Sequence, residues 1–482
     1  MTFETLDPAD WEQTRKLAHE MLDMALDHTR DVRDRSIWKD MPTAIRNGFE
    51  TPAPQQGMPL GDLMDDVQSQ VMQYPMGNIH PRFWGWYMGA SNFTGAMADF
   101  LAAVQGSNLG GGNHAAALID RQVVDWLREM IGLPEGASGT LVSGGSVANL
   151  IGLTVARNVK SGIDMREEGI AAMDKPMRYY GSDQMHSCHQ KSLETLGLGN
   201  KALRRIPTQD DLTMDLEALA GMVAQDRADG LNPACVIATA GTVNTGAIDD
   251  LSAIADFCRE EGLWFHVDGC IGALIAIAHD NSWRVSGIER ADSVALDPHK
   301  WLHAPFEVGC ALVRSHDAHH ATFTLTPEYL EPQSRGVAGA AFLHDYGIQT
   351  SRGFRALKVW MSLKEHGVQK FGRLIDQDIE KARYLTSLIE AEDDLTLMFP
   401  TNINIVCFRY DPGGLSPETL RAINSEIMLC LQEEGTAVLS DTTVHGAHCL
   451  RVAVNNHRTQ KQDLDLLVSE ILRLGHKLRI AA

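Results

Sequence analysis

The sequence predicts an α/β fold in which a mostly parallel sheet is covered by helices on both faces. Short apolar runs alternate with helical stretches between about residues 86 and 365, as in ACVIATAG (234–241), LSAIADFCREEG (251–262) and LWFHVDG (263–269). Strands without polar alternation are typical of sheets buried on both sides, and the helices between them provide the crossovers of a parallel sheet. A strand, helix, strand, helix pattern then predicts a smaller C-terminal α/β domain.

The N-terminal region predicts a helical arm. Residues 9–30 place Trp11, Leu17, Met21 and Leu26 at approximate helical spacing with charged residues between them. Four prolines between positions 42 and 59 interrupt regular structure before a second helical stretch at 62–74. Two helices and a proline-rich strap enclose little core, so we expect residues 1–85 to pack on something larger, such as a second subunit.

Residues 86–365 form the predicted large domain, to which SVALD (293–297) and GCALVR (309–314) contribute further strands. The helical stretch FRALKVWMSLKEHG (354–367) closes this region. The predicted small domain, residues 366–482, contains NINIVCFRY, a helix start at Ser416-Pro417-Glu418, CLRVAVNN and a last helix near 461–478. Ligands of such sheets bind beyond the carboxyl ends of the strands, which is where we expect the site.

Composition argues against several classes of protein. The formal charge of −21, from 63 acidic and 42 basic residues, disfavours a nucleic-acid partner. The apolar runs, such as GCIGALIAIA (269–278), are too short to span a membrane, and the polar N-terminus lacks a signal-peptide pattern. Eight scattered cysteines without a CxxC pair, and the HDAHH segment (316–320) without a second cluster, predict neither a disulfide framework nor a metal site. We expect a cytoplasmic protein.

Two glycine-rich segments differ in their context. Residues 197–202 match the dinucleotide pattern GxGxxG/A but follow a helix end and do not open a helix. The segment Ser143-Gly144-Gly145-Ser146 follows the strand-like TLV and leads into the helical ANLIGLTVAR, where backbone N–H groups and the Ser146 hydroxyl can hold a phosphate. From this motif alone, a plain helix-capping turn is an equally good interpretation.

Asp268 and Lys300 stand at the ends of consecutive strand-like runs, in FHVDG and DPHKW. A buried carboxylate needs a cationic partner, and either a structural salt bridge or a protonated heterocycle nitrogen satisfies Asp268. A lysine near apolar groups and other cations is a better amine nucleophile than one in water, although a strand-end lysine is more often simply solvated.

The order of these residues, together with HPRFWGWY, SDQMHSCHQKS, ATAGTVNTGAIDDL and SRGFRALKVW, resembles the pyridoxal-phosphate enzymes of fold type I. In detail it resembles the group II amino-acid decarboxylases, the family of aromatic-L-amino-acid and glutamate decarboxylases. The resemblance covers nearly the whole chain. It implies pyridoxal 5′-phosphate as the cofactor, an amino acid as the substrate and a homodimer.

Residue by residue, the resemblance implies that Lys300 forms the Schiff base with the cofactor and that Asp268 pairs with its pyridinium nitrogen. His186, in DQMHS, is similar to the histidine that stacks on the cofactor ring. Thr242 is expected near the ring or its 3′ oxygen. The expected contacts on the phosphate side are Gly145, Ser146 and His299.

Tyr329, in TPEYL, lies in a proline- and glycine-rich stretch that resembles the family's catalytic lid, in which this tyrosine helps to protonate the carbon left after carbon dioxide departs. Members that form aldehydes often differ at this tyrosine or at the stacking histidine, and both are present here. We therefore expect decarboxylation of an L-amino acid to its amine. An aldehyde-forming oxidative deaminase, another carbon–carbon lyase and a catalytically silent scaffold remain open.

Phe83, Trp86 and Tyr87 lie where the family builds part of its substrate wall, which favours an aromatic substrate, although core packing explains the same cluster almost as well. Several positions depart from the family, and one of them is Gly269-Cys270, which replaces the pair Ala-Ala often seen after the aspartate. Asp297 stands where relatives often carry asparagine, and a carboxylate near the phosphate is unfavourable unless it turns away or pairs with a cation. Gly353 replaces an arginine common in the aromatic-specific branch.

Overall fold

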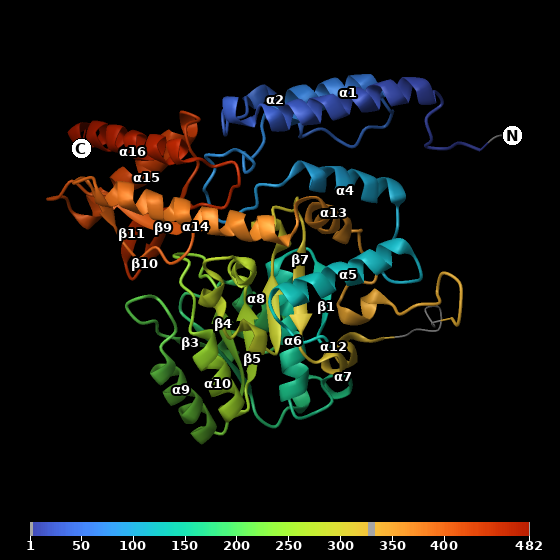
Figure 1. Ribbon diagram of the computed structural model, residues 1–482, viewed down its shortest axis with the longest axis vertical. Coiled ribbons are helices and arrows are strands. Elements are labelled where there is room, and N and C mark those ends of the chain that lie inside the picture. The colour runs from blue at the N-terminus through green and yellow to red at the C-terminus, as the bar shows by residue number, and fades with distance from the viewer. Residues whose placement is uncertain (1–2, 326–332, 482) are drawn as a thin grey trace.

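A seven-stranded sheet forms the centre of the computed structural model, which describes residues 3–325 and 333–481 (Figure 1). The strands stand in the order β1-β7-β6-β5-β4-β2-β3, and all run parallel except β7, which is antiparallel to both of its neighbours. The mostly parallel sheet of the prediction is confirmed. Its strands are β1 (Ser138–Val142), β2 (Met177–Ser182), β3 (Leu203–Ile206), β4 (Asn232–Thr239), β5 (Trp264–Asp268), β6 (Ser293–Leu296) and β7 (Gly309–Val313).

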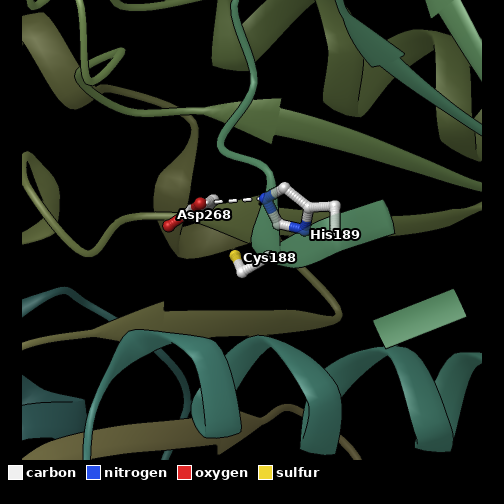
Figure 2. Close-up of side chains that lie close together, drawn as sticks. All are labelled: Cys188, His189 and Asp268. Carbon is white, nitrogen blue, oxygen red and sulfur yellow. Dashed lines mark hydrogen bonds and ion pairs between the residues drawn. The ribbon is translucent and has the colours of Figure 1, made fainter. Parts of the chain in front are cut away.

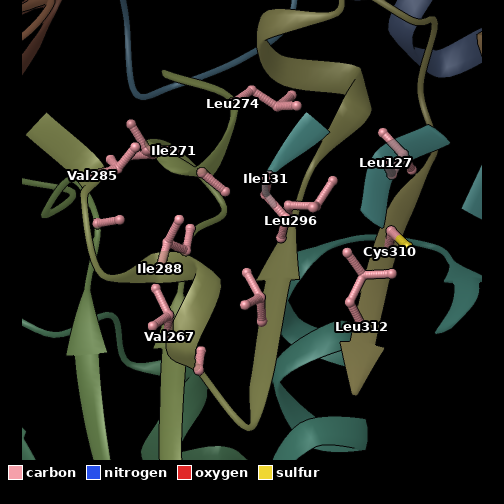
Figure 3. Packing of buried hydrophobic residues seen from close by; sticks show 14 of the residues in the cluster. Leu127, Ile131, Val267, Ile271, Leu274, Val285, Ile288, Leu296, Cys310 and Leu312 are labelled. Atoms are coloured by element: carbon pink, nitrogen blue, oxygen red, sulfur yellow. The ribbon is translucent and has the colours of Figure 1, made fainter. Parts of the chain in front are cut away.

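Helices cover both faces of this sheet, as predicted. On β4, Val236 and Ala238 pack in a buried cluster with side chains of α5, α9 and α10, whereas Cys235 and Ile237 pack in another cluster with side chains of α6 and α8. Figure 3 shows part of the first cluster, with leucine and valine side chains of β5, β6 and β7. The helices are α5 (Ala115–Met130), α6 (Gly145–Lys160), α8 (Cys188–Thr195), α9 (Leu216–Ala228) and α10 (Leu251–Glu261).

The carboxyl ends of the parallel strands meet at one edge of the sheet. Thr239 at the end of β4 is in register with Asp268 at the end of β5, and Asp268 is in register with Ala295 of β6. The chain leaves β6 through Asp297 and turns at once into the short helix α11 (Pro298–Trp301), with proline at its first position, where no backbone N–H is needed. Asp268 and Lys300 are therefore held at the same edge.

A four-stranded antiparallel sheet, in the order β10-β11-β9-β8, forms the C-terminal part of the chain. Its strands are β8 (Leu395–Leu397), β9 (Ile405–Tyr410), β10 (Ser440–Val444) and β11 (Ala447–Ala453), and it packs against α14 (Val368–Glu390), α15 (Pro417–Glu433) and α16 (Lys461–Ala481). Ser416 caps α15 by accepting the Thr419 N–H at 3.2 Å, which confirms the predicted helix start. The sequence analysis did not identify β8, β10 or α14.

The N-terminal arm lies along the outside of the molecule (Figure 1). Helix α1 (Trp11–Arg30) has no buried residue, and α3 (Leu60–Asp66) continues into a π-helical turn at Val67–Val71, so both predicted helical stretches are present. The short α2 (Thr43–Gly48) lies between them, and α4 (Phe93–Gln105) follows. The arm has almost no core of its own, as its sequence predicted.

The remaining helices are α7 (Met165–Glu168), α12 (His316–Phe323) and α13 (Ala356–His366). The glycine motif at 197–202 connects α8 to β3, so it does not open a helix after a strand. In α12, His319 bonds to the Ser138 hydroxyl and the Tyr346 carbonyl oxygen, both at 2.9 Å. Within the described ranges, we find no helix with the length and apolarity needed to cross a bilayer.

Candidate active site

A cavity of about 640 Å³ lies at the carboxyl ends of the parallel strands. Its volume is in the range of small-molecule sites, and its wall combines apolar and aromatic side chains with a few polar groups. Among its lining residues are eight to which the sequence analysis assigned a site role: Trp86, Tyr87, Gly145, Ser146, His186, Asp268, His299 and Lys300.

Lys300 extends from α11 into this cavity. Its Nζ lies 3.0 Å from Oδ2 of Asp297 and 5.7 Å from the centre of the Tyr87 ring. Burial alone would lower the pKa of Lys300, but the Asp297 carboxylate raises it above the ordinary value. The unexplained carboxylate of the DPHKW segment thus pairs with a cation, which is one of the two arrangements that the sequence allowed.

Asp268 is buried at the end of β5 and accepts two hydrogen bonds. His189 Nε2–H donates to Oδ2 at 2.9 Å, and the backbone N–H of Cys270 donates to Oδ1 at 3.2 Å. Burial alone would raise the pKa of Asp268, but the hydrogen bond from His189, followed by that from Cys270 and the charge of Lys300, holds it well below the ordinary range. The carboxylate is therefore ionised.

The start of α6 forms another part of the cavity wall. Gly144 precedes the helix, and no side chain among the described residues caps it, so its first N–H groups are free to meet an anion. A Cβ on Gly145 would collide with Cys270 Sγ, so only glycine allows this close approach. An uncapped helix start beside a cavity fits a phosphate group better than the plain capping turn that the sequence left open.

Two histidines line the cavity in defined orientations. His186 Nδ1 accepts the backbone N–H of Cys188 at 3.1 Å, and burial lowers the pKa of His186, so its ring is neutral at pH 7. His299 Nδ1–H donates to the Val308 carbonyl oxygen at 2.7 Å, and its ring lies 4.6 Å from that of Phe306. Burial also lowers the pKa of His299.

Two predicted site residues that the structure describes, Phe83 and Thr242, do not line this cavity. Phe83 is buried against Ile37 and Val438, so the expectation that it lines the pocket is corrected: it is a core residue. Thr242 is also fully buried, with its hydroxyl accepting the Ala247 N–H at 3.1 Å and bonded to the Thr245 hydroxyl, so its neighbours Gly241 and Val243 line the cavity instead. Tyr329 lies outside the described residues.

The structure adds polar residues that the sequence analysis missed. Figure 2 shows His189 beside Cys188 and Asp268, the one group of possible metal-ligating side chains in the described part of the chain, although His189 and Asp268 are hydrogen-bonded to each other. Asn149 lies next to this group, accepting from His266 Nε2–H at 2.8 Å. The only signal for His189 was its spacing of three residues from His186, which places both near one helix start.

Comparison with protein families identifies this arrangement. The model described as "Pyridoxal-dependent decarboxylase conserved domain" matches residues 42–411. The chain belongs to the pyridoxal-dependent decarboxylases. This membership confirms the resemblance seen in the sequence, and it makes the chain an enzyme with pyridoxal phosphate as its cofactor.

Individual relatives of this decarboxylase match nearly its full length. The aromatic-L-amino-acid decarboxylase of Bacillus atrophaeus is 34% identical, with 98% of this chain and 97% of that protein covered. The crystal structure of Oryza sativa TDC with PLP and tryptamine superposes with a TM-score of 0.90 at 25% identity, over 98% of this chain and 100% of that one. The phenylacetaldehyde synthase of a Rosa hybrid cultivar is 26% identical over 96% of this chain and 93% of that protein.

The residues of the cavity fit pyridoxal phosphate. The uncapped start of α6 offers backbone N–H groups to a phosphate. The ionised Asp268 offers a counter-charge to a protonated ring nitrogen, and Lys300 offers a primary amine in the same cavity. One anion-binding end, one carboxylate and one amine are the three groups that this cofactor requires.

Proposed function

We propose that this decarboxylase converts an aromatic L-amino acid to the corresponding amine and carbon dioxide. The observation that carries the proposal is the single cavity shared by Lys300, Asp268 and the start of α6. Trp86, Tyr87 and Phe306 line the same cavity, and aromatic walls favour aromatic side chains. The relative from Bacillus atrophaeus, named for aromatic amino acids, supports the same substrate class.

We assign the roles as follows. Pyridoxal phosphate, when bound, supplies an electron sink for the pair of electrons left on the α-carbon as carbon dioxide departs. Lys300 would hold the cofactor through Nζ, and Asp268 would keep its ring nitrogen protonated. His186, neutral and at the cavity wall, would pack on the ring. The start of α6, with Gly145 and Ser146, would hold the phosphate.

Proton return completes the proposed reaction. Tyr329 is proposed as the residue that delivers a proton to the α-carbon, on the strength of its place in TPEYL. Its segment follows α12, and the described chain resumes at residue 333. Delivery to the α-carbon yields the amine, whereas failure to deliver leaves that carbon open to oxidation.

The test is a panel of aromatic, acidic and basic L-amino acids, with carbon dioxide and amine measured for each. We expect kcat/KM to be highest for an aromatic substrate and to fall on the order of tenfold to a hundredfold in a Trp86→Ala variant, since a lost apolar contact in a pocket has about that effect. Trp283→Ala, an exposed tryptophan outside the cavity, is the matched control. Preference for an acidic or basic amino acid would refute the aromatic assignment.

A second candidate, aldehyde-forming oxidative deamination, is favoured by one observation, the similarity to the phenylacetaldehyde synthase. Separate detection of amine, aldehyde and hydrogen peroxide distinguishes the two reactions. Stoichiometric peroxide would establish oxidation as the main activity. Absence of any product, together with the absence of a visible cofactor band, would indicate a catalytically silent scaffold, and a product of other bond cleavage would indicate another lyase.

We also propose that the enzyme is a homodimer. Helix α1 has no buried residue, and it exposes Trp11, Met21 and Leu26. Helix α4 exposes Phe100 and Val104, of which Val104 is 71% exposed. Large apolar side chains exposed on both α1 and α4 favour a covering partner surface, and a second copy of the chain supplies one. Light scattering should give twice the chain mass of 53.0 kDa, and Val104→Asp should shift the population toward monomer.

The division into an arm (1–85), a large domain (86–365) and a small domain (366–482) is likewise proposed, since one buried cluster is built almost entirely from residues 382–474. In a monomeric variant such as Val104→Asp, limited proteolysis should cut first within the arm, because its helices α1 and α3 have no buried residue.

A cytoplasmic location is proposed from the cysteines. All eight are free and seven are buried, a pattern typical of a reducing compartment. Cell fractionation tests it, and recovery in a secreted fraction would refute it.

A further inference from the structure

We propose that His189 is a positioning residue of the active site, which holds Asp268 ionised and fixed in orientation for the ring nitrogen of the cofactor. The inference rests on the proposed role of Asp268. It concerns a residue that neither lines the cavity nor belongs to the predicted site.

The hydrogen bond between His189 and Asp268 joins two buried side chains. His189 Nε2 lies 2.9 Å from Asp268 Oδ2, and the relative exposure of the two side chains is 0% and 7% (Figure 2). A hydrogen bond to a charged group inside a protein contributes more than a bond between neutral groups, because little water competes for it. His189 engages Oδ2 and the Cys270 N–H engages Oδ1, so both carboxylate oxygens are held in place while Asp268 lines the cavity.

The hydrogen position on His189 follows from its surroundings. Nδ1 of His189 is buried and has no hydrogen-bond partner within residues 3–325 and 333–481, so Nε2 is the nitrogen that carries the hydrogen. The neighbouring His266 is committed elsewhere, because its Nε2–H donates to Asn149 and its Nδ1 bonds to the Ser293 hydroxyl, both at 2.8 Å. His189 is therefore the histidine that donates a hydrogen bond to Asp268.

One short segment carries two functions. His186 lies before α8 at the cavity wall, and His189, one turn later, lies behind Asp268. Between them, Cys188 is a buried thiol whose pKa is raised by burial, so it adds no charge that would compete for Asp268. Movement of this helix start would displace the stacking group and the support of the carboxylate together.

The experiment compares His189→Met, which fills the space without a donor, with His189→Gln, whose side-chain amide can still donate. Dissociation constants for pyridoxal phosphate are measured with the cofactor-free protein, and the protonation of the ring nitrogen is followed by NMR with ¹⁵N-labelled cofactor. We expect the dissociation constant of the Met variant to rise on the order of tenfold to a hundredfold. Its ring nitrogen should lose the proton at lower pH than in the wild type, and Gln should restore both properties to within a few-fold.

His319→Met is the matched control, because His319 is also a buried, hydrogen-bonded histidine but lies on α12 outside the cavity. It should leave the ¹⁵N signal unchanged. A wild-type signal and affinity in His189→Met would refute the proposal, as would equal losses in Met and Gln variants that track a loss of folding measured without cofactor. If the wild-type protein itself binds no cofactor, the proposed function fails instead.

Discussion

Lys300 Nζ lies 3.0 Å from Asp297 Oδ2, three residues away, and both side chains line the cavity. Asp297 Oδ1 has no hydrogen-bond partner within the described part of the chain, and Oδ2 has Lys300 as its nearest cation, with His299 Nε2 at 3.7 Å. An amine must be uncharged to attack a carbonyl carbon. The pair therefore stabilises the charged lysine while no cofactor is attached, and Asp297 is in contact to receive the proton when the amine reacts.

Replacing Asp297 with asparagine should increase the rate at which the Lys300 amine attaches the cofactor. Burial then lowers the pKa of Lys300 without the opposing carboxylate, so the uncharged amine is more abundant at pH 7. Covalent cofactor attachment, followed by absorbance, should therefore remain fast at lower pH than in the wild type. At a fixed pH below the pKa of Lys300, the attachment rate should rise about tenfold for each unit by which this pKa falls.

The control for that experiment is Asp99→Asn, which removes the carboxylate paired with Lys358 at 2.8 Å. Neither residue lines the cavity. An attachment rate whose pH dependence is the same in Asp297→Asn and wild type would show that Asp297 does not control the amine.

Lys300→Ala should abolish the visible absorption band that forms when cofactor attaches, because no amine replaces Nζ. Lys364→Ala, a lysine that lies over the Trp126 and Trp360 rings, should retain the band. Spectra of cofactor-free protein titrated with pyridoxal phosphate provide the measurement. Survival of the band in Lys300→Ala would place the covalent link on another residue.

Stability should fall as the pH is lowered from about 6.5 toward about 4. Burial lowers the pKa of several histidines, which therefore take up protons on unfolding, and the shift is large for five of them: His80 (about 4), His266 (about 3), His319 (about 4), His457 (about 4) and His303. Burial raises the pKa of Asp249 and Asp378 to about 6, which acts in the opposite direction because the folded state then binds their protons.

Five histidines against two aspartates leave about three protons taken up on unfolding near pH 5, and hence a loss of about 4 kcal/mol per pH unit. Urea unfolding of the protein at a series of pH values measures the slope, and His319→Gln should reduce it by about one proton. A stability that stays constant or rises on acidification would contradict these histidine assignments.

Tyr329→Phe should slow amine formation on the order of a hundredfold, the usual scale for loss of a proton-transferring side chain, while carbon dioxide release is less affected. Aldehyde and peroxide should rise as amine falls. Tyr346→Phe is the control, since this tyrosine bonds to His316 and does not line the cavity. Clean amine production at the wild-type rate in Tyr329→Phe would remove it from the mechanism.

Apolar runs were sufficient to predict five of the seven strands of the large sheet, whereas β2 and β3 were not identified. The runs at 234–241, 263–269, 293–297 and 309–314 all became strands, because a strand buried on both faces leaves a continuous apolar signature. Periodicity does not report strand direction, so β7 was not distinguished as antiparallel. The short β8 and β10 escaped detection, since three to five residues with polar positions carry little pattern.

The resemblance carried by the order of motifs along the chain predicted the family, the cofactor and the roles of Lys300 and Asp268. Both residues follow strand ends, and strand ends of a parallel sheet meet at one edge. Only the tertiary structure decided which side chains touch. It paired Asp297 with Lys300, brought His189 behind Asp268, and placed Phe83 and Thr242 in the core. Those relationships depend on the direction of each side chain and on segments brought together by folding, and neither is encoded in local spacing.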